Sequence, residues 1–438
     1  MNEEFLERIR SYIPDEYDAF VKTLSQPMYR GLRIQTHKID PETFFAHAGM
    51  RLQKAPFSDQ IYYIDRPMGH TIGHIAGLFY LQEPSASSAV TALDVQPDDT
   101  VLDLCAAPGG KSTQIADRLT SGFLVSNEIS RHRAMTLLSN MERMGVMNMA
   151  VTNLPPEKLC EKTAEAFDKV LVDAPCSGEG MMKKHAEAAD WSLARVLTCA
   201  DRQKEILKSA YRMLKKDGTM VYSTCTYAKE ENEEVIRWFL AQYPDMKLVP
   251  VEASFGRPGF GLSECRRIFP MDGGEGHFVA KLVKTGGGIG RLPIVKSDRP
   301  DASARTFIKQ QIGRLPAYFQ VKGSAVFAME HPFLKLPALR QGIYVGDVLK
   351  NRFEPAHAFY MNADWIDAYQ MKAELNEEQA DAFYHGMPVV LAHSKGFTAV
   401  CVNGYPIGYG KSDGRQIKNK LPKGLRLPPH SHIKKEFR

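Results

Sequence analysis

The sequence predicts an α/β fold in which a doubly wound, mostly parallel sheet is flanked by a small N-terminal α+β region and a C-terminal β-rich module. Three observations predict it. Apolar runs of strand length alternate with helical stretches from about residue 71 to residue 284, which is typical of a parallel sheet covered on both faces. A glycine-rich turn joins the first of the strand runs of this sheet to a helix. Short β runs replace the alternation near the C-terminus.

The N-terminal region, residues 1–70, combines helices with one strand. Amphipathic spacing predicts short helices over residues 2–9 and 17–24. The segment LRIQTHKI, residues 32–39, is strand-like. We therefore expect a small α+β unit ahead of the sheet.

The central region, residues 71–284, supplies the sheet. Periodic apolar positions predict helices over residues 112–119, 131–144 and 201–214. Strands that alternate with helices in this way build a parallel sheet with both faces buried. The predicted strands are, in chain order, VLDLCAA, FLVSNE, MAVTN, KVLVDAP, TMVYSTC and HFVAKLVK.

Residues 285–302 are the predicted linker, because the segment KTGGGIGRLP is rich in glycine and ends in proline. The remaining residues, 303–438, begin with a helical segment near 304–312 and contain another near 377–384. Short β runs such as PVVLAH and FTAVCVNGYPIGYG follow. This part of the chain is expected to form a small β-rich module, a compact barrel.

Composition limits the class of protein. A chain of 438 residues with 44% hydrophobic residues can bury more than one core. A charged fraction of 24% excludes a mainly disordered chain, and a net charge of +5 permits a polyanionic partner without demanding one. No run approaches the ~20 apolar residues that cross a bilayer. We expect a cytoplasmic protein with no membrane partner, and nothing in the sequence demands more than a monomer.

The seven cysteines do not form a C-x-x-C pair. Neither a zinc knuckle nor a thioredoxin-type redox site is therefore indicated, and no metal site is expected. In a reducing cytosol free thiols survive and can be catalytic. Four of the cysteines have no special setting and are interpreted as structural, namely Cys160, Cys199, Cys265 and Cys401.

The glycine-rich turn LDLCAAPGGKST, residues 102–113, has three interpretations. A phosphate-binding P-loop requires a glycine where this chain has Cys105. A dinucleotide fingerprint requires G-x-G-x-x-G, which is absent. The third is a turn whose backbone approaches S-adenosylmethionine, and it is favoured because Glu128 ends the next strand, where an acidic residue can pair with the ribose hydroxyls.

Two cysteines fall at the ends of neighbouring predicted strands. Asp173 and Cys176 follow the fourth strand and Cys225 follows the fifth. The carboxyl ends of the strands are where a doubly wound fold binds its ligands. Most free cysteines are small buried hydrophobic residues, but two at adjacent strand ends, each flanked by Gly, Pro, Ser or Thr, favour a catalytic role.

A thiol suits methylation of carbon 5 of cytosine, which is a poor nucleophile by itself. A thiolate that adds to carbon 6 makes carbon 5 enamine-like, so that it can take a methyl group. Asp173 could assist by hydrogen bonding or protonation at ring N3, and Lys111 and the cationic cofactor would favour the thiolate. The residues alone do not decide whether Cys176 or Cys225 attacks, because DNA cytosine methyltransferases carry their nucleophile in a Pro-Cys such as Pro175-Cys176.

These motifs resemble the Nop/Sun family of RNA cytosine-C5 methyltransferases over about residues 25–284. The resemblance rests on ordered segments, and the pairing of DAPCSG with a separate TC is highly specific. In the C-terminal part, NRFEPAHAF and NKLPKGLRLP resemble the RsmF-like bacterial branch that acts on small-subunit ribosomal RNA. The remaining matching segments are FYLQEPSA, LDLCAAPGGK, VDAPCSGEGMMKK, STCTYAKEENE and GEGHFVAKL.

The resemblance implies a Rossmann-like class I methyltransferase domain at residues 71–284, an RNA-binding N-terminal region at 1–70 and a PUA-like RNA-binding module in the C-terminal part. The cofactor would be S-adenosylmethionine. The substrate would be ribosomal RNA, 16S in this branch, either naked or in the small subunit. Transfer RNA is the alternative substrate, and a non-catalytic ribosome-assembly factor that binds RNA is the competing class.

The resemblance also implies residue roles. Cys225 matches the nucleophile of the family, and Cys176 matches the cysteine that releases the methylated product. Glu128 would hold the ribose, and Asp173 would lie near the methionine end of the cofactor and the target base. Asn153 stands where the family usually has an Asp at the adenine edge, and its amide can still hydrogen-bond adenine. The turn that would wrap the cofactor comprises Cys105, Ala106, Ala107, Pro108, Gly109, Gly110 and Lys111.

RNA contacts are expected from basic residues in three places, since phosphate contacts come from Lys and Arg. Residues 411–438 contain nine Lys or Arg. Lys183 and Lys184 follow the DAPCSG loop, near where the phosphate of a flipped nucleotide would lie, and the neighbouring His185 is expected at the surface. The third place is the N-terminal strand segment, with Arg30, Arg33, His37 and Lys38.

Overall fold

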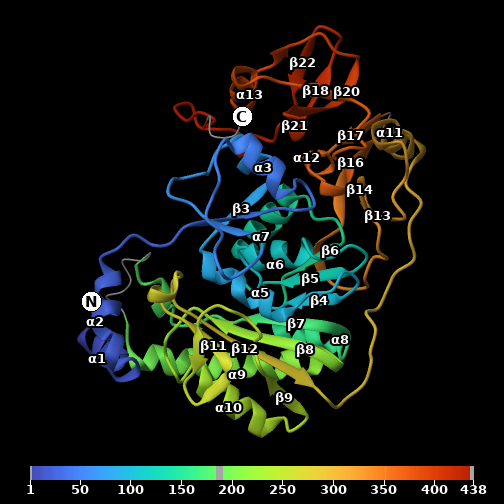
Figure 1. The fold of residues 1–438 in the computed structure, drawn as a ribbon. Helices are drawn as coiled ribbons and strands as arrows, with labels where there is room; N and C mark the ends of the chain where they lie inside the picture. The colour runs from blue at the N-terminus through green and yellow to red at the C-terminus, as the bar shows by residue number, and fades with distance from the viewer. Residues whose placement is uncertain (1, 184–190, 351, 435–438) are drawn as a thin grey trace.

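The computed structural model describes residues 2–183, 191–350 and 352–434 (Figure 1). The predictions for Lys184 and His185, and for the last basic residues of the chain, lie outside the described residues. Among the helices of the described part, none is long and apolar enough to cross a membrane.

The central sheet has the order β10-β11-β12-β8-β7-β4-β5-β6-β15, where β15 is Ala338–Gln341, and β9 pairs with β12 outside this order. Its parallel part runs from β8 to β6, and β12 pairs antiparallel with β8. The predicted doubly wound α/β fold is therefore confirmed. The strands are β4 (Thr100–Asp103), β5 (Phe123–Asn127), β6 (Met149–Thr152), β7 (Phe167–Asp173), β8 (Leu214–Thr224), β9 (Met246–Val249), β10 (Arg257–Gly259), β11 (Leu262–Ile268) and β12 (His277–Lys284).

Helices cover both faces of this sheet (Figure 1). Successive strand residues point to opposite faces: Leu124 packs in the cluster with Leu137 of α7, whereas Val125 packs in the cluster with Leu207 of α9. Long apolar strands buried on both sides are what a parallel sheet requires. The helices are α5 (Ser88–Leu93), α6 (Gly110–Ala116), α7 (Arg131–Met144), α8 (Pro156–Thr163), α9 (Leu193–Met213) and α10 (Glu233–Gln242).

The N-terminal part forms two packed units. Helices α1 and α2 place Phe5 and Phe20 in one core cluster with Phe269 and with Tyr227, which lies two residues after Cys225 in the chain. Three strands form a small antiparallel sheet of order β2-β1-β3. The elements are α1 (Glu3–Tyr12), α2 (Tyr17–Leu24), β1 (Gly31–Ile34), α3 (Pro41–Ala48), β2 (Ile61–Tyr63), α4 (Ile72–Ile75) and β3 (Phe79–Gln82).

The C-terminal part is β-rich, as predicted, and contains sheets of order β13-β14-β16-β17 and β18-β20-β21-β22-β19. One strand, β15, was not predicted: it pairs antiparallel with β6 and extends the central sheet. The elements are α11 (Ala302–Ile312), β13 (Tyr318–Lys322), β14 (Ala325–Met329), β15 (Ala338–Gln341), β16 (Ile343–Leu349), β17 (Arg352–Pro355), α12 (His357–Tyr360), β18 (Lys372–Glu374), α13 (Glu377–Tyr384), β19 (Val389–Val390), β20 (Gly396–Val402), β21 (Tyr405–Ser412) and β22 (Gln416–Asn419).

Candidate active site

A cavity of about 650 Å³ lies at the carboxyl ends of β4, β5, β7 and β8. This is the edge at which open α/β sheets bind ligands, and the volume lies within the range of cofactor sites. The polar and sulfur-bearing groups that line it are Cys105, Asn127, Glu128, Ser130, Arg133, Glu157, Asp173, Cys176, Arg202, Glu205 and Cys225.

The glycine-rich turn leads from β4 into α6 along one side of the cavity. Cys105 and Ala107 are among the lining residues. Gly109 has a φ of +111°, a conformation that favours glycine, and a Cβ there would lie 3.1 Å from Leu137 Cδ1. A Cβ at Gly110 would lie 3.2 Å from the Tyr80 ring. A side chain at either position would crowd its neighbours by a few tenths of an ångström, and at Gly109 it would also strain the backbone, whatever the turn binds. The other predicted turn residues, Ala106, Pro108 and Lys111, complete the segment without lining the cavity.

Glu128 follows β5 and lines the cavity with a side chain that is only 3% exposed. Its carboxylate accepts a hydrogen bond from Ser130 N at 2.8 Å and pairs with Arg133 Nη1 at 3.3 Å. Asn153 is not among the lining residues: its Nδ2 donates to the carbonyl oxygens of Glu128 at 2.6 Å and Ile129 at 2.8 Å. Asn153 thus supports the segment that carries Glu128, and its contact with adenine stays a prediction.

Asp173 ends β7 and is held by two donors. Lys111 Nζ lies 2.7 Å from Oδ2, and Ser223 Oγ donates to Oδ1 at 2.7 Å. Burial by itself would lower the pKa of Lys111, but the charges of Asp173 and Cys225 outweigh it, so the pKa is raised. Lys111 is accordingly an ammonium ion that pairs with the predicted carboxylate and interacts electrostatically with one of the predicted thiols, Cys225.

The two predicted thiols are in contact. Cys176 Sγ and Cys225 Sγ are 3.2 Å apart, and Cys225 N donates to Cys176 Sγ at 3.4 Å. The hydrogen bond to Cys225, followed by burial, raises the pKa of Cys176 well above that of a free thiol. Either sulfur could donate in this contact, and the raised pKa of Cys176 favours its protonated form. The structure brings Cys176, Cys225 and Asp173 to one cavity, as the sequence indicated.

Two buried carboxylates near the cavity were missed by the sequence analysis. Asp103 is fully buried at the end of β4, where Ser112 Oγ donates to its Oδ2 at 2.6 Å and Oδ1 has no partner among the described residues. Burial raises the pKa of Asp103 to about 7. Glu231 lies beneath the two cysteine loops and accepts from Ser177 N at 3.0 Å. The acidic run KEENE shortly after Cys225 was the available signal for Glu231.

The prediction of RNA contacts is wrong for three of the basic residues. The guanidinium of Arg33 is fully buried and donates to Thr113 Oγ1 at 2.7 Å. Lys38 is also buried and donates to the carbonyl oxygens of Ala76 and Arg143. Lys183 has a 7% exposed side chain that pairs with Glu275. These cations join parts of the fold to each other, because a buried cation needs fixed acceptors. By contrast, Lys411, Arg415, Lys418, Lys423 and Lys434 are exposed.

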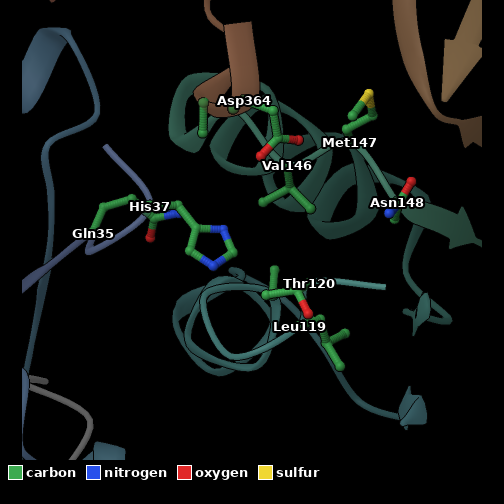
Figure 2. Close-up of a pocket in the computed structure, with 11 residues that line it drawn as sticks. Gln35, His37, Leu119, Thr120, Val146, Met147, Asn148 and Asp364 are labelled. Atoms are coloured by element: carbon green, nitrogen blue, oxygen red, sulfur yellow. The ribbon is translucent and has the colours of Figure 1, made fainter. Parts of the chain in front are cut away.

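A second cavity, of about 340 Å³, lies at the amino ends of β5 and β6 (Figure 2). His37, from the loop after β1, faces the same space as Asp364, from the C-terminal part (Figure 2). Gln35 and Asn148 also line it. None of the predicted catalytic residues contributes to this cavity.

Comparison with solved structures identifies the fold. A methyltransferase homolog protein from Pyrococcus horikoshii is 26% identical, with a TM-score of 0.57, over 65% of this chain and 95% of that one. NSun6 from Pyrococcus horikoshii is 22% identical, with a TM-score of 0.59, over 65% of this chain and 99% of that one. The doubly wound sheet, its glycine-rich turn and the acidic cavity at the carboxyl edge define a Rossmann-like methyltransferase domain.

Comparison with sequences identifies the family. Ribosomal RNA small subunit methyltransferase F of Klebsiella pneumoniae is 33% identical over 97% of this chain and 96% of that protein, and the namesake from Vibrio parahaemolyticus is 33% identical over 96% of each. The chain belongs to the RsmF family of 16S rRNA methyltransferases. The matching family models are the N-terminal domain of RsmF at residues 1–84, RsmB/F at 90–283, the first C-terminal domain of RsmF at 306–362 and the RsmF PUA domain at 370–427.

Proposed function

We propose that this protein transfers a methyl group from S-adenosylmethionine to carbon 5 of a cytosine in small-subunit ribosomal RNA, through a covalent adduct between Cys225 and carbon 6. The observation that carries the proposal is the 3.2 Å contact of two thiols beside the Lys111–Asp173 pair. This contact occurs in a chain that is 33% identical, over 97% of its length, to a ribosomal RNA small subunit methyltransferase F.

The cavity fits the cofactor in size and in donor set. Its volume of about 650 Å³ suits a nucleoside-sized ligand, Glu128 offers a carboxylate to the ribose hydroxyls, and the 64% exposed Ile129 beside it offers an apolar surface to the adenine. When bound, S-adenosylmethionine supplies an electrophilic methyl group on a sulfonium ion and leaves as a neutral thioether.

Cys225 is the proposed nucleophile. Its thiolate forms a bond to carbon 6, and the electron pair of the ring double bond moves to carbon 5, which then bonds the methyl carbon. The S–H of Cys176 and the ammonium of Lys111 both stabilise negative charge on the Cys225 sulfur. Asp173 would deliver a proton to ring N3 during the addition, and Lys111, 2.7 Å away, can supply it.

Cys176 is proposed to act in product release. The proton on carbon 5 passes to water, the N3 proton returns through Asp173 to Lys111, the ring double bond returns, and the bond between sulfur and carbon 6 breaks with its electron pair on Cys225. A departing thiolate that accepts a hydrogen bond leaves more readily, and a protonated Cys176, whose sulfur lies 3.2 Å away, would be that donor. Without that donor the adduct should persist.

The remaining parts of the chain are proposed to bind the RNA. The family model for the PUA domain covers residues 370–427, and exposed Lys and Arg continue to Lys434. We propose an organisation with an N-terminal region at residues 1–70, a methyltransferase domain at 71–284, a linker at 285–302 and a C-terminal part at 303–438. The protein would act as a monomer in the cytoplasm, where its RNA substrate is.

The test is methyl transfer from labelled S-adenosylmethionine to RNA from cells that lack the gene. We expect label in 16S rRNA, and bisulfite sequencing should locate a cytosine that is methylated only when the gene is present. Separate reactions with naked rRNA, assembled small subunits and transfer RNA identify the substrate. No change at any cytosine would overturn the proposal. If calorimetry detected no binding of S-adenosylmethionine, a non-catalytic assembly factor would be favoured.

A further inference from the structure

The two cysteine loops are joined by one buried carboxylate. Glu231 is fully buried beneath them. Its Oε2 accepts from the backbone N of Ser177, the residue after Cys176, at 3.0 Å, and its Oε1 accepts from the Ser177 hydroxyl. Gln203 Nε2 donates to Glu231 Oε2 at 2.8 Å and to the carbonyl oxygen of Pro175 at 3.1 Å. Glu231 therefore fixes the chain on both sides of Cys176.

The same network reaches the Cys225 loop. Ser177 Oγ lies 2.8 Å from Thr226 Oγ1, and Thr226 follows Cys225 directly. The backbone N of Gly180 donates to the carbonyl oxygen of Cys225 at 2.9 Å. Two loops that are about fifty residues apart in the chain are thus tied at the point where their sulfur atoms meet. A shift of the Ser177 segment would separate the two thiols.

Glu231 forms no ion pair with any residue that the structure describes. Burial raises its pKa to about 7, so near neutral pH the group is part carboxylic acid and part carboxylate, and no described cation pairs with the carboxylate form. A buried carboxylate of this kind lowers stability unless its hydrogen bonds are fully used. Buried, perturbed carboxylates concentrate at functional sites. The side chain that these hydrogen bonds serve is Cys176.

We propose that Glu231 is a positioning residue for product release, which holds the Pro175–Ser177 segment so that the Cys176 thiol stays in contact with the Cys225 sulfur. This inference rests on the proposed function, because release matters only if Cys225 forms an adduct. Glu231 touches neither thiol through a hydrogen bond of its own. It acts through Ser177 and Gln203.

The experiment compares Glu231→Ala with Glu231→Gln and with Glu234→Ala, an exposed acidic neighbour three residues further along the chain. The Gln side chain keeps an oxygen for Ser177 N and Gln203, so release within about twofold of wild type is expected. The Ala side chain leaves Ser177 N without its acceptor. Misplacement of a reacting group by even 1 Å slows a step by up to about a hundredfold, so denaturing gels should show an RNA–protein adduct and turnover should fall at least about tenfold. Glu234→Ala should behave as wild type.

A double-variant comparison separates positioning from general loss of structure. If Glu231 acts through Cys176, adding Glu231→Ala to Cys176→Ala should trap no more adduct and slow turnover no further, whereas independent effects would add. Binding of S-adenosylmethionine, measured by calorimetry, should be unchanged in both. Additive effects would overturn the inference.

Two failures are distinguishable. If Cys176→Ala traps no adduct, the release step of the proposed function fails. If it does trap an adduct but Glu231→Ala releases product like Glu234→Ala, only the role of Glu231 fails. Should Glu231→Ala not fold, Ser177→Ala decides, because it removes the hydroxyl contacts to Glu231 and Thr226 in a small side chain. Several-fold more adduct supports the inference, and release at the wild-type rate overturns it.

Discussion

Two cavities of this protein lie at opposite ends of the same parallel strands. The carboxyl-end cavity is lined by Cys176, Cys225 and Asp173, which follow or end β7 and β8. The amino-end cavity is lined by His37 and Asp364, which come from the N-terminal and C-terminal parts of the chain (Figure 2). Both hold polar groups, but only the first brings nucleophiles together with a fixed ammonium and carboxylate.

The difference between the two cavities shows what holds reacting side chains at a fixed spacing. Neighbouring parallel strands fix the spacing of whatever follows their carboxyl ends, so two thiols can be held 3.2 Å apart. The amino-end cavity forms where three parts of the chain meet, and its groups are held by separate loops. We therefore expect substitutions at the carboxyl end to change chemistry, and substitutions at the amino end to change stability slightly.

The largest expected effect is that of Cys225→Ala. Loss of the nucleophile should lower methyl transfer by a factor on the order of 10⁴ or more and leave no covalent RNA complex. Transfer of labelled methyl groups and denaturing gels measure the two quantities. Retained methylation in this variant would contradict the covalent route.

Cys176→Ala should have a smaller effect of a different kind. The adduct should form and persist, with turnover lowered about a hundredfold, because the departing thiolate loses its hydrogen-bond donor. The same gels are the measurement. If Cys176→Ala forms no adduct while Cys225→Ala traps one, the roles of the two cysteines are exchanged.

Glu128→Ala should weaken the binding of S-adenosylmethionine. A hydrogen bond to a charged group contributes about 1.5–3 kcal/mol, so the dissociation constant should rise roughly tenfold to a hundredfold. Calorimetry measures it. Glu157→Ala is the matched control, since Glu157 lines the same cavity but is exposed. Equal losses in the two variants would mean that Glu128 has no specific contact with the ribose.

The fold class was predictable because strand–helix alternation is a local pattern. Helix α7 begins and ends where its periodicity predicts, at Arg131 and Met144. The edge strand β15 was not predictable, because it pairs with β6 through tertiary contacts between residues that are nearly two hundred positions apart in the chain. Local patterns identify elements, but they do not say which elements meet.

The same limit applies to the site. Strand ends indicated that Cys176 and Cys225 would meet, and they do. Burial is not visible in a single sequence, so Arg33 and Lys38 were assigned to RNA by their charge although both are buried. Glu231 was overlooked for the converse reason, since an acidic run usually indicates an exposed surface. The cysteine roles themselves stay a prediction.

Asp103→Asn should change how stability depends on pH. Burial raises the pKa of Asp103 from 3.8 to about 7, so the folded state binds more protons than the unfolded state between these values. The contribution of Asp103 to the free energy of unfolding is fully present below about pH 3.8 and is lost as the pH rises through about 7. The variant should remove this decline, with a difference of roughly 1–3 kcal/mol between pH 5 and pH 8. Urea unfolding measures it, with the exposed Asp98→Asn as control. Identical pH profiles would contradict the protonated carboxyl.

The smallest expected effect belongs to the amino-end cavity. The Asp364 side chain is exposed. Desolvation by its surroundings raises its pKa and the charge of His37 opposes that shift, so Asp364→Asn removes a carboxylate that is still in contact with water. We expect a change in unfolding free energy of less than about 1 kcal/mol and methyl transfer equal to wild type. Thermal unfolding and the labelled-methyl reaction measure both. A variant that folds and binds S-adenosylmethionine normally but fails to methylate RNA would place this cavity in substrate binding. The division between a chemical end and a structural end of the sheet would then be wrong, because both ends would serve the reaction.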